Sequence, residues 1–192
     1  MPAPIDRVRI LESVLAVWRE DGYAGATTRR VAALAGVSEM TLFRRFGDKA
    51  ALFRAALELE AARFTADAIP YTGSLTGDLE RIVAAYEALL ARSAPIILDV
   101  LLESPRKAEL SQLRPVPLAA IAQVTAIFDR YRREGRLRDH TPIEAVLALL
   151  SPLVMAALLR RAQPGLVAAA APRERVRAFL KGWARADTAA PG

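Results

Sequence analysis

Basic side chains of the kinds that bind polyanions are concentrated between Ala26 and Arg54. They are Arg29, Arg30, Arg44, Arg45, Lys49 and Arg54. Only two acidic residues, Glu39 and Asp48, lie among them. The guanidinium fork of arginine matches the O6 and N7 atoms of guanine, and a lysine ammonium suits a phosphate. Because the whole chain is also basic, with a net charge of +6, these residues indicate a nucleic-acid partner.

Two short helices joined by a glycine turn are predicted to hold these side chains, within Thr27 to Leu52. Thr27 or Thr28 can cap the first helix, and Gly36 stands where that helix must end in a left-handed conformation. Ser38 follows and can cap the second helix. This layout is typical of a DNA-reading helix-turn-helix.

The second helix has one face that should pack and one that should stay free. At about 100° per residue, Leu42 and Phe46 fall together on the packing face. The free face and its flanks carry Met40, Thr41, Phe43, Arg44 and Arg45. We expect this free face to enter a DNA groove, with Arg44 reading guanine and Glu39 able to accept from the N4 of cytosine.

A phosphate contact is predicted where the next helix starts. Gly47 and Asp48 interrupt the chain, so Lys49 falls in the first turn of a third helix. Unpaired N–H groups and the positive dipole end favour an anion there. We therefore expect Lys49 and this helix end to bind the DNA backbone.

The same stretch resembles the TetR (tetracycline repressor) family of bacterial transcriptional regulators. The matching residues are Gly22-Tyr23, Ala26-Thr27-Thr28-Arg29, Val31-Ala32, Ala35-Gly36-Val37-Ser38, Thr41-Leu42-Phe43, Phe46, Lys49 and Leu52. The resemblance covers about the first third of the chain. It implies that the helix from Ser38 is the recognition helix, and that Glu39-Met40 replaces a common basic-glycine pair on the reading surface.

The resemblance also implies individual DNA contacts. Arg29 should come within reach of the major groove, Phe43 stands where the family usually has a phosphate-contacting tyrosine, and Lys49 is a backbone contact. The full set of expected DNA-binding residues is Thr27, Thr28, Arg29, Ser38, Glu39, Met40, Thr41, Phe43, Arg44, Arg45 and Lys49.

Helical periodicity throughout the chain predicts an all-α fold of two domains. The predicted helices, besides the pair above, span about 6–21, 48–68, 75–93, 96–104, 115–134, 142–162 and 172–186. The Pro and Gly of Ile69-Pro-Tyr-Thr-Gly-Ser mark the one convincing boundary. We expect an N-terminal three-helix DNA-binding domain in 1–68 and a larger ligand-binding and dimerisation domain in 69–192.

The helix over 141–162 is apolar on all sides, so it must be covered on all sides. Either it is ordinary core, or a second subunit covers part of it together with the helix after Pro172. A helix-turn-helix protein needs two half-sites for affinity, and the resembled family dimerises through its last two long helices, so we expect a homodimer. The candidate interface residues are Leu150, Val154, Leu158, Phe179 and Trp183.

Apolar side chains of the C-terminal half form either close-packed core or the wall of a cavity. Pro152 should kink its helix and could thereby open space. An apolar cavity with few hydroxyls suits a hydrophobic or amphipathic effector of modest size. The candidate ligand-binding residues are Tyr86, Leu90, Ile97, Leu101, Val124, Phe128, Tyr131 and Met155.

Residue types for enzyme chemistry are sparse. The chain has no cysteine, which excludes a disulfide framework, a thiolate metal site and a cysteine nucleophile. The single histidine, His140, lies in a predicted loop and fits a turn residue better than a general base or metal ligand. No Gly-rich phosphate loop and no glycine-framed serine occurs. We therefore expect no enzyme, no metal and no cofactor.

The expected location is the cytoplasm. No apolar run reaches the ~18 residues needed to span a bilayer, and the charged stretch after Met1-Pro-Ala-Pro-Ile-Asp argues against a signal peptide.

These expectations combine in a ligand-responsive transcriptional repressor. The resemblance implies allostery. An effector that binds better when the two DNA-binding domains of the dimer are wrongly spaced for the operator lowers the affinity for DNA. The alternative is a helical ligand-binding or interaction module without sequence-specific DNA reading.

Overall fold

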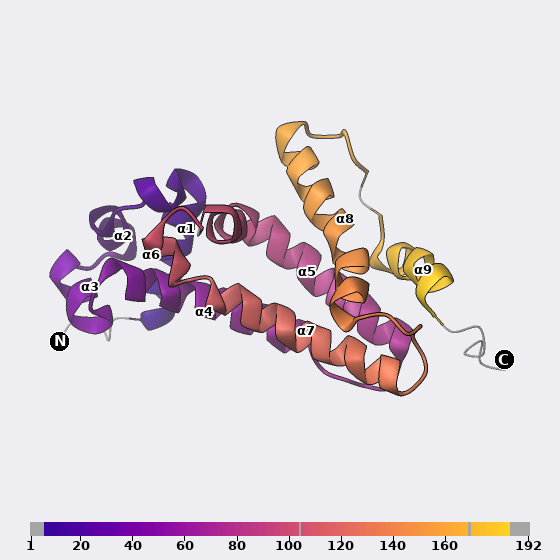
Figure 1. Cartoon of the computed structure of the whole chain (residues 1–192). Coiled ribbons are helices and arrows are strands. Elements are labelled where there is room, and N and C mark those ends of the chain that lie inside the picture. The colour runs from indigo at the N-terminus through magenta and orange to yellow at the C-terminus, as the bar shows by residue number, and fades with distance from the viewer. Residues whose placement is uncertain (1–5, 104, 169, 185–192) are drawn as a thin grey trace. The chain divides into compact units, whose positions relative to one another are not determined.

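The computed structural model describes residues 6–103, 105–168 and 170–184, and within them it confirms an all-α fold. The helices are α1 (Arg7–Gly25), α2 (Thr28–Ala35), α3 (Glu39–Phe46), α4 (Lys49–Ala68), α5 (Leu75–Leu98), the π-helix η1 (Asp99–Glu103), α6 (Ala108–Ser111), α7 (Pro115–Arg133), α8 (Pro142–Ala162) and α9 (Pro172–Trp183), as Figure 1 shows. The short helix α6 was not predicted, because four residues are too few to establish a periodicity.

The break predicted between the helices over 75–93 and 96–104 is present as a kink at Ser93, and the two helical stretches are joined across it in α5. Helix α5 continues through Pro95 and leaves helical geometry only at Ser93, at φ −138° and ψ 16°. Proline removes one hydrogen bond and crowds the preceding turn, and this local distortion at Ser93 accommodates it. The chain then continues directly into the π-helix η1. Helix α8 likewise continues across Pro152. The end expected for the last helix, 186, lies outside the described residues.

The chain divides into two compact units that are not consecutive in sequence. Unit 1 comprises residues 1–62 and 93–118, and unit 2 comprises 63–92 and 119–192. Unit 1 therefore holds the helix-turn-helix together with the segment that contains η1 and α6. The functional boundary at residue 68 remains a prediction.

An aromatic cluster forms the centre of unit 1. The rings of Trp18, Tyr23 and Phe53 lie 5.2 to 5.4 Å apart, centroid to centroid, and all three are buried. Ile96, Val100, Leu110 and Leu113 of the later segment belong to the same core. The three N-terminal helices therefore do not form their core alone, because residues from the second half of the chain complete it.

A buried carboxylate organises one end of unit 2. Asp78 is inaccessible to solvent in the first turn of α5. It accepts hydrogen bonds from the Tyr131 hydroxyl at 2.6 Å, from the Thr72 N–H at 2.9 Å and from Arg81 Nη1 at 3.0 Å. Burial raises the pKa of Asp78, but the donors from Thr72, Tyr131 and Arg81 outweigh it, so the pKa lies below its usual value. These bonds attach α7 and the loop 69–74 to α5.

Helix α8 has a buried side and an exposed apolar side. Val146, Leu149 and Leu153 are buried within unit 2. By length and composition, α8 could cross a membrane, with a mean hydropathy of 2.1, although the sequence predicted no such segment. Glu144 in the first turn and Arg160 in the last turn of α8 bound its uncharged stretch. The core helix of a soluble protein can have the same length and composition.

Candidate nucleic-acid interface

Helix α2 begins and ends as its cap residues predict. Thr27, and not Thr28, is the N-cap, and its hydroxyl accepts from the Arg30 N–H at 3.2 Å. Gly36 adopts the left-handed conformation at φ 70°. The N–H of Val37 then reaches the carbonyl of Ala32 at 3.0 Å. Glycine adopts this left-handed conformation without strain, and the hydrogen bond from Val37 closes the end of α2. Together they determine the turn before α3.

Helix α3 is held by a cap and by one buried side chain. The hydroxyl of Ser38 accepts from the Thr41 N–H at 3.2 Å and lies 2.8 Å from the Thr41 hydroxyl. Leu42 is buried, and Phe46 packs partly against the same core. Gly47, at φ 89°, ends the helix, and its N–H donates to the carbonyl of Phe43 at 2.8 Å. The packing face predicted for this helix is therefore confirmed.

Three polar residues of the helix-turn-helix, Thr28, Arg30 and Glu39, have partners inside the protein. The Thr28 hydroxyl donates to the carboxylate of Glu39, which joins the start of α2 to the start of α3. Arg30 pairs with Glu20 and Asp21 of α1. Glu39 and Arg30 therefore contribute to the geometry of the helix-turn-helix, and Arg30 is less available for an outside anion than its neighbour Arg29.

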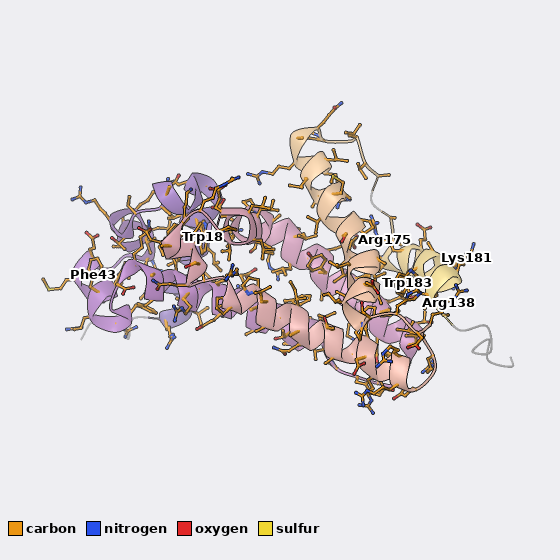
Figure 2. All side chains as sticks on the ribbon, in the orientation of Figure 1. Trp18, Phe43, Arg138, Arg175, Lys181 and Trp183 are labelled. Atoms are coloured by element: carbon orange, nitrogen blue, oxygen red, sulfur yellow. The ribbon has the colours of Figure 1, made fainter. Side chains whose placement is uncertain are left out.

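The opposite side of α3 is open to solvent. Met40 is 79% exposed and Phe43 is 44% exposed, and Figure 2 shows Phe43 on the outer side of this helix. Arg44 and Arg45 are also exposed, as is Arg29 in the first turn of α2. Arg29 and Arg44 make no hydrogen bond or ion pair with any residue that the structure describes. We call the side formed by Met40, Thr41 and Arg44 the reading face.

Lys49 is less free than the sequence suggested. Its ammonium donates to the carbonyl of Tyr23 at 3.0 Å. It also lies 4.5 Å from the centre of the Tyr23 ring and 5.3 Å from that of Phe53. Burial lowers the pKa of Lys49, and the nearby carboxylate of Glu109 offsets this only in part. Lys49 thus joins α4 to the end of α1, a role that sequence spacing does not reveal.

The expected ligand-binding residues are not one set in the structure. Leu90, Val124, Phe128 and Tyr131 are buried in unit 2, and Tyr86 is partly buried there. Ile97 and Leu101 belong to unit 1, and Met155 is 57% exposed. The Tyr131 hydroxyl is already bound to Asp78, and burial together with this bond raises its pKa well above the usual value. Within the described residues, no group of three His, Asp or Glu side chains is placed to hold a metal ion.

The expected interface residues divide into two groups. Leu150 and Phe179 are buried within the single chain, with the Phe179 ring 6.2 Å from that of Phe128. Val154, Leu158 and Trp183 are partly exposed. Trp183, labelled in Figure 2, stacks on Phe179 at 5.4 Å. The large exposed apolar side chains of α8 are Ile143, Leu147, Met155 and Leu159.

Known proteins are similar to this chain at two levels. Residues 10–56 match the family described as bacterial regulatory proteins, tetR family. The HTH-type transcriptional repressor AcnR of Corynebacterium efficiens is 44% identical over 57 residues, which span 30% of this chain and 30% of that repressor. Sequence similarity is therefore concentrated in one segment.

Similarity of fold extends over nearly the whole chain. A TetR-family transcriptional regulator from Rhodococcus sp. has a TM-score of 0.75 at 17% identity, covering 92% of this chain and 96% of that one. The flavonoid-responsive regulator FrrA has a TM-score of 0.65 at 20% identity, covering 94% and 97%. Residues 10–56 thus carry the similarity to the tetR family of bacterial regulatory proteins, and the all-α fold is shared with solved regulators of that family.

Proposed function

We propose that this protein is a sequence-specific DNA-binding transcriptional regulator, acting in the cytoplasm as a homodimeric repressor that a small apolar or amphipathic effector releases from its operator. The observation that carries the proposal is the reading face of α3. Its helix is capped by Ser38 and anchored by Leu42, while Arg44 projects without a partner among the described residues. A rigid helix with a free arginine fork matches the requirement for reading guanine in the major groove.

Additional support comes from the surroundings of that face. Arg29 is exposed in the first turn of α2, where it can supply a second basic contact. Thr28, Glu39 and Arg30 are bonded to other protein groups. These bonds fix the geometry of the helix-turn-helix before DNA binds, and such preorganisation lowers the entropic cost of docking. Phe43 and Lys49 are the proposed contacts to the phosphate backbone, Lys49 through the positive end of α4.

The DNA-binding proposal is tested by selecting bound fragments from genomic DNA and measuring affinity for the selected fragment and for random DNA over a salt series. A regulator is expected to prefer its operator by at least about 10³-fold. Arg44→Ala should reduce that ratio, whereas Arg30→Ala serves as the matched control. Equal affinity for both DNAs, with a steep salt dependence, would instead favour a helical module without sequence-specific reading.

The effector proposal rests on unit 2. Among the candidate ligand-binding residues, Tyr86 is partly buried, and its hydroxyl makes no hydrogen bond with any described residue. Burial raises the pKa of this hydroxyl. Its ring packs edge-on against Phe64 at 6.0 Å. FrrA, which shares this fold, is described as flavonoid-responsive.

Thermal-shift screening should find apolar or amphipathic stabilisers that release operator DNA, and Tyr86→Phe and Tyr86→Ala should change the affinity of the protein for these compounds. Polyanionic hits alone would contradict the proposal.

A further inference from the structure

Met40 is the most exposed large apolar side chain among the described residues. It is 79% exposed, against 63% for Leu102 and 57% for Met155. It is the second residue of α3, on the side of the helix opposite the buried Leu42. A single exposed apolar side chain is ordinary on a protein surface, so its meaning depends on what surrounds it.

The polar groups around Met40 are already bonded to one another. Ser38 and Thr41 share their hydroxyl contact at 2.8 Å, and Ser38 also caps the helix. The carboxylate of Glu39 accepts from Thr28. The first turn of α3 therefore presents an exposed thioether side chain beside polar groups that already have partners.

Met40 and Arg44 point in nearly the same direction. They lie one helical turn apart, with projections that differ by about 40° around the helix axis. The buried Leu42 lies on the opposite side of the helix. A partner that docks on Arg44 must therefore also cover Met40, and the exposed charges of Arg29 and Arg44 favour an anionic partner such as DNA.

The major groove offers one exposed apolar group, the C5 methyl of thymine, and apolar side chains are known to contact it. We propose that Met40 is a specificity-determining residue that packs on a thymine methyl group in each operator half-site, within about two base pairs of the guanine that Arg44 reads. The proposal rests on the proposed function and extends it by naming a base. Glu39, whose carboxylate is bonded to Thr28, then positions the helix and does not read cytosine.

The test uses the full-length protein and the operator obtained from genomic selection. Each thymine of one half-site is replaced in turn by deoxyuridine, which removes only the methyl group, and affinity is measured by fluorescence anisotropy. For the native protein, replacing one particular thymine per half-site should reduce the affinity about fourfold, the value expected for one buried methyl group. Met40→Ala should bind the thymine and deoxyuridine forms equally at that position, and Met40→Leu should retain a difference.

Two variants separate this effect from general damage. Arg44→Ala should keep the thymine preference while losing the preference for guanine. Leu34→Ala removes another exposed apolar side chain of the same helix-turn-helix, 53% exposed on α2, and should leave every deoxyuridine effect unchanged. If Met40→Ala shows the same deoxyuridine losses as the native protein at all positions, the inference is overturned while sequence-specific binding stands. Absence of any preference in the selection would overturn the proposed function itself.

Discussion

The carboxylate of Asp99 accepts a hydrogen bond from the indole nitrogen of Trp18 at 3.0 Å, across 81 residues of sequence. The same oxygen accepts from the N–H of Tyr23 at 3.0 Å. Tyr23 follows Gly22, whose φ of 66° breaks the regular helix near the end of α1. Asp99 of η1 thus accepts from both the buried indole N–H and the backbone N–H that this break leaves without a helical partner. These two bonds attach η1 to α1, the helix before the helix-turn-helix.

Asp99→Ala should destabilise the protein by about 1–3 kcal/mol, because it leaves buried donors of Trp18 and Tyr23 without an acceptor. Urea unfolding followed by far-UV circular dichroism measures the change. Glu58→Ala, an exposed carboxylate of α4 in the same unit, is the control and should change stability by less than about 0.5 kcal/mol. Equal stability of both variants would mean that the Asp99 bonds are not maintained in solution.

Arg44→Ala and Arg29→Ala should each weaken operator binding by roughly 1–3 kcal/mol and relax the preference at one base position per half-site. Arg30→Ala removes an equally basic residue that is paired with Glu20 and Asp21, so its base preference should be unchanged. Binding to a library with each half-site position randomised measures both properties. An unaltered preference in Arg44→Ala would show that another surface reads the DNA.

Lys49→Ala should have two separable effects. Loss of the bond to the Tyr23 carbonyl and of the contacts with the two rings should lower stability by about 1–2 kcal/mol. Loss of a phosphate contact should weaken binding to all sequences and reduce the slope of log affinity against log salt by about 1. Phe43→Ala should weaken all sequences similarly without changing that slope. A native slope for Lys49→Ala would assign the residue a purely structural role.

Acid should weaken the Asp78 network. The folded-state pKa of Asp78 lies below the ordinary 3.8, so the folded state binds this proton less readily than the unfolded chain. The resulting stabilisation is complete above the ordinary pKa and is lost as the pH falls through the folded value.

Asp78→Asn should therefore be less stable at pH 7, by about 1–3 kcal/mol, because the buried Tyr131 hydroxyl loses a charged acceptor. The difference from the native protein should shrink below pH 4. Urea unfolding between pH 7 and 2.5 measures it, with Asp67→Asn as the control because Asp67 is exposed and has no partner among the described residues. A constant difference across this range would exclude the linkage.

Substitutions on α8 and α9 should separate assembly from folding. Met155 and Leu147 are exposed on one side of α8, whereas Phe179 is buried in its own subunit. Met155→Glu should give a folded monomer with reduced operator affinity, because the charge opposes burial between subunits. Phe179→Glu should unfold the subunit. Light scattering together with circular dichroism distinguishes the two results, and Leu118→Glu, at an exposed position of α7, should remain dimeric. A native dimer from Met155→Glu would place the interface elsewhere.

Most of the helix-turn-helix was determined by local sequence. Thr27 and Ser38 cap their helices, Gly36 takes the left-handed conformation, and Leu42 faces the core, as their types and spacing predicted. Each of these features depends on a few neighbouring residues, because caps, glycine turns and helical faces are short-range properties. The open face of α3 follows from the same periodicity.

Only the tertiary structure decided which groups meet across long stretches of chain. The sequence did not predict that Asp99 bonds to Trp18 or that Lys49 donates to the Tyr23 carbonyl. It also did not predict that Phe179 is buried while Met155 is exposed. An apolar periodicity states that a helix face must be covered but not what covers it. A charged side chain likewise shows its chemistry in the sequence, while its partner depends on how distant segments pack.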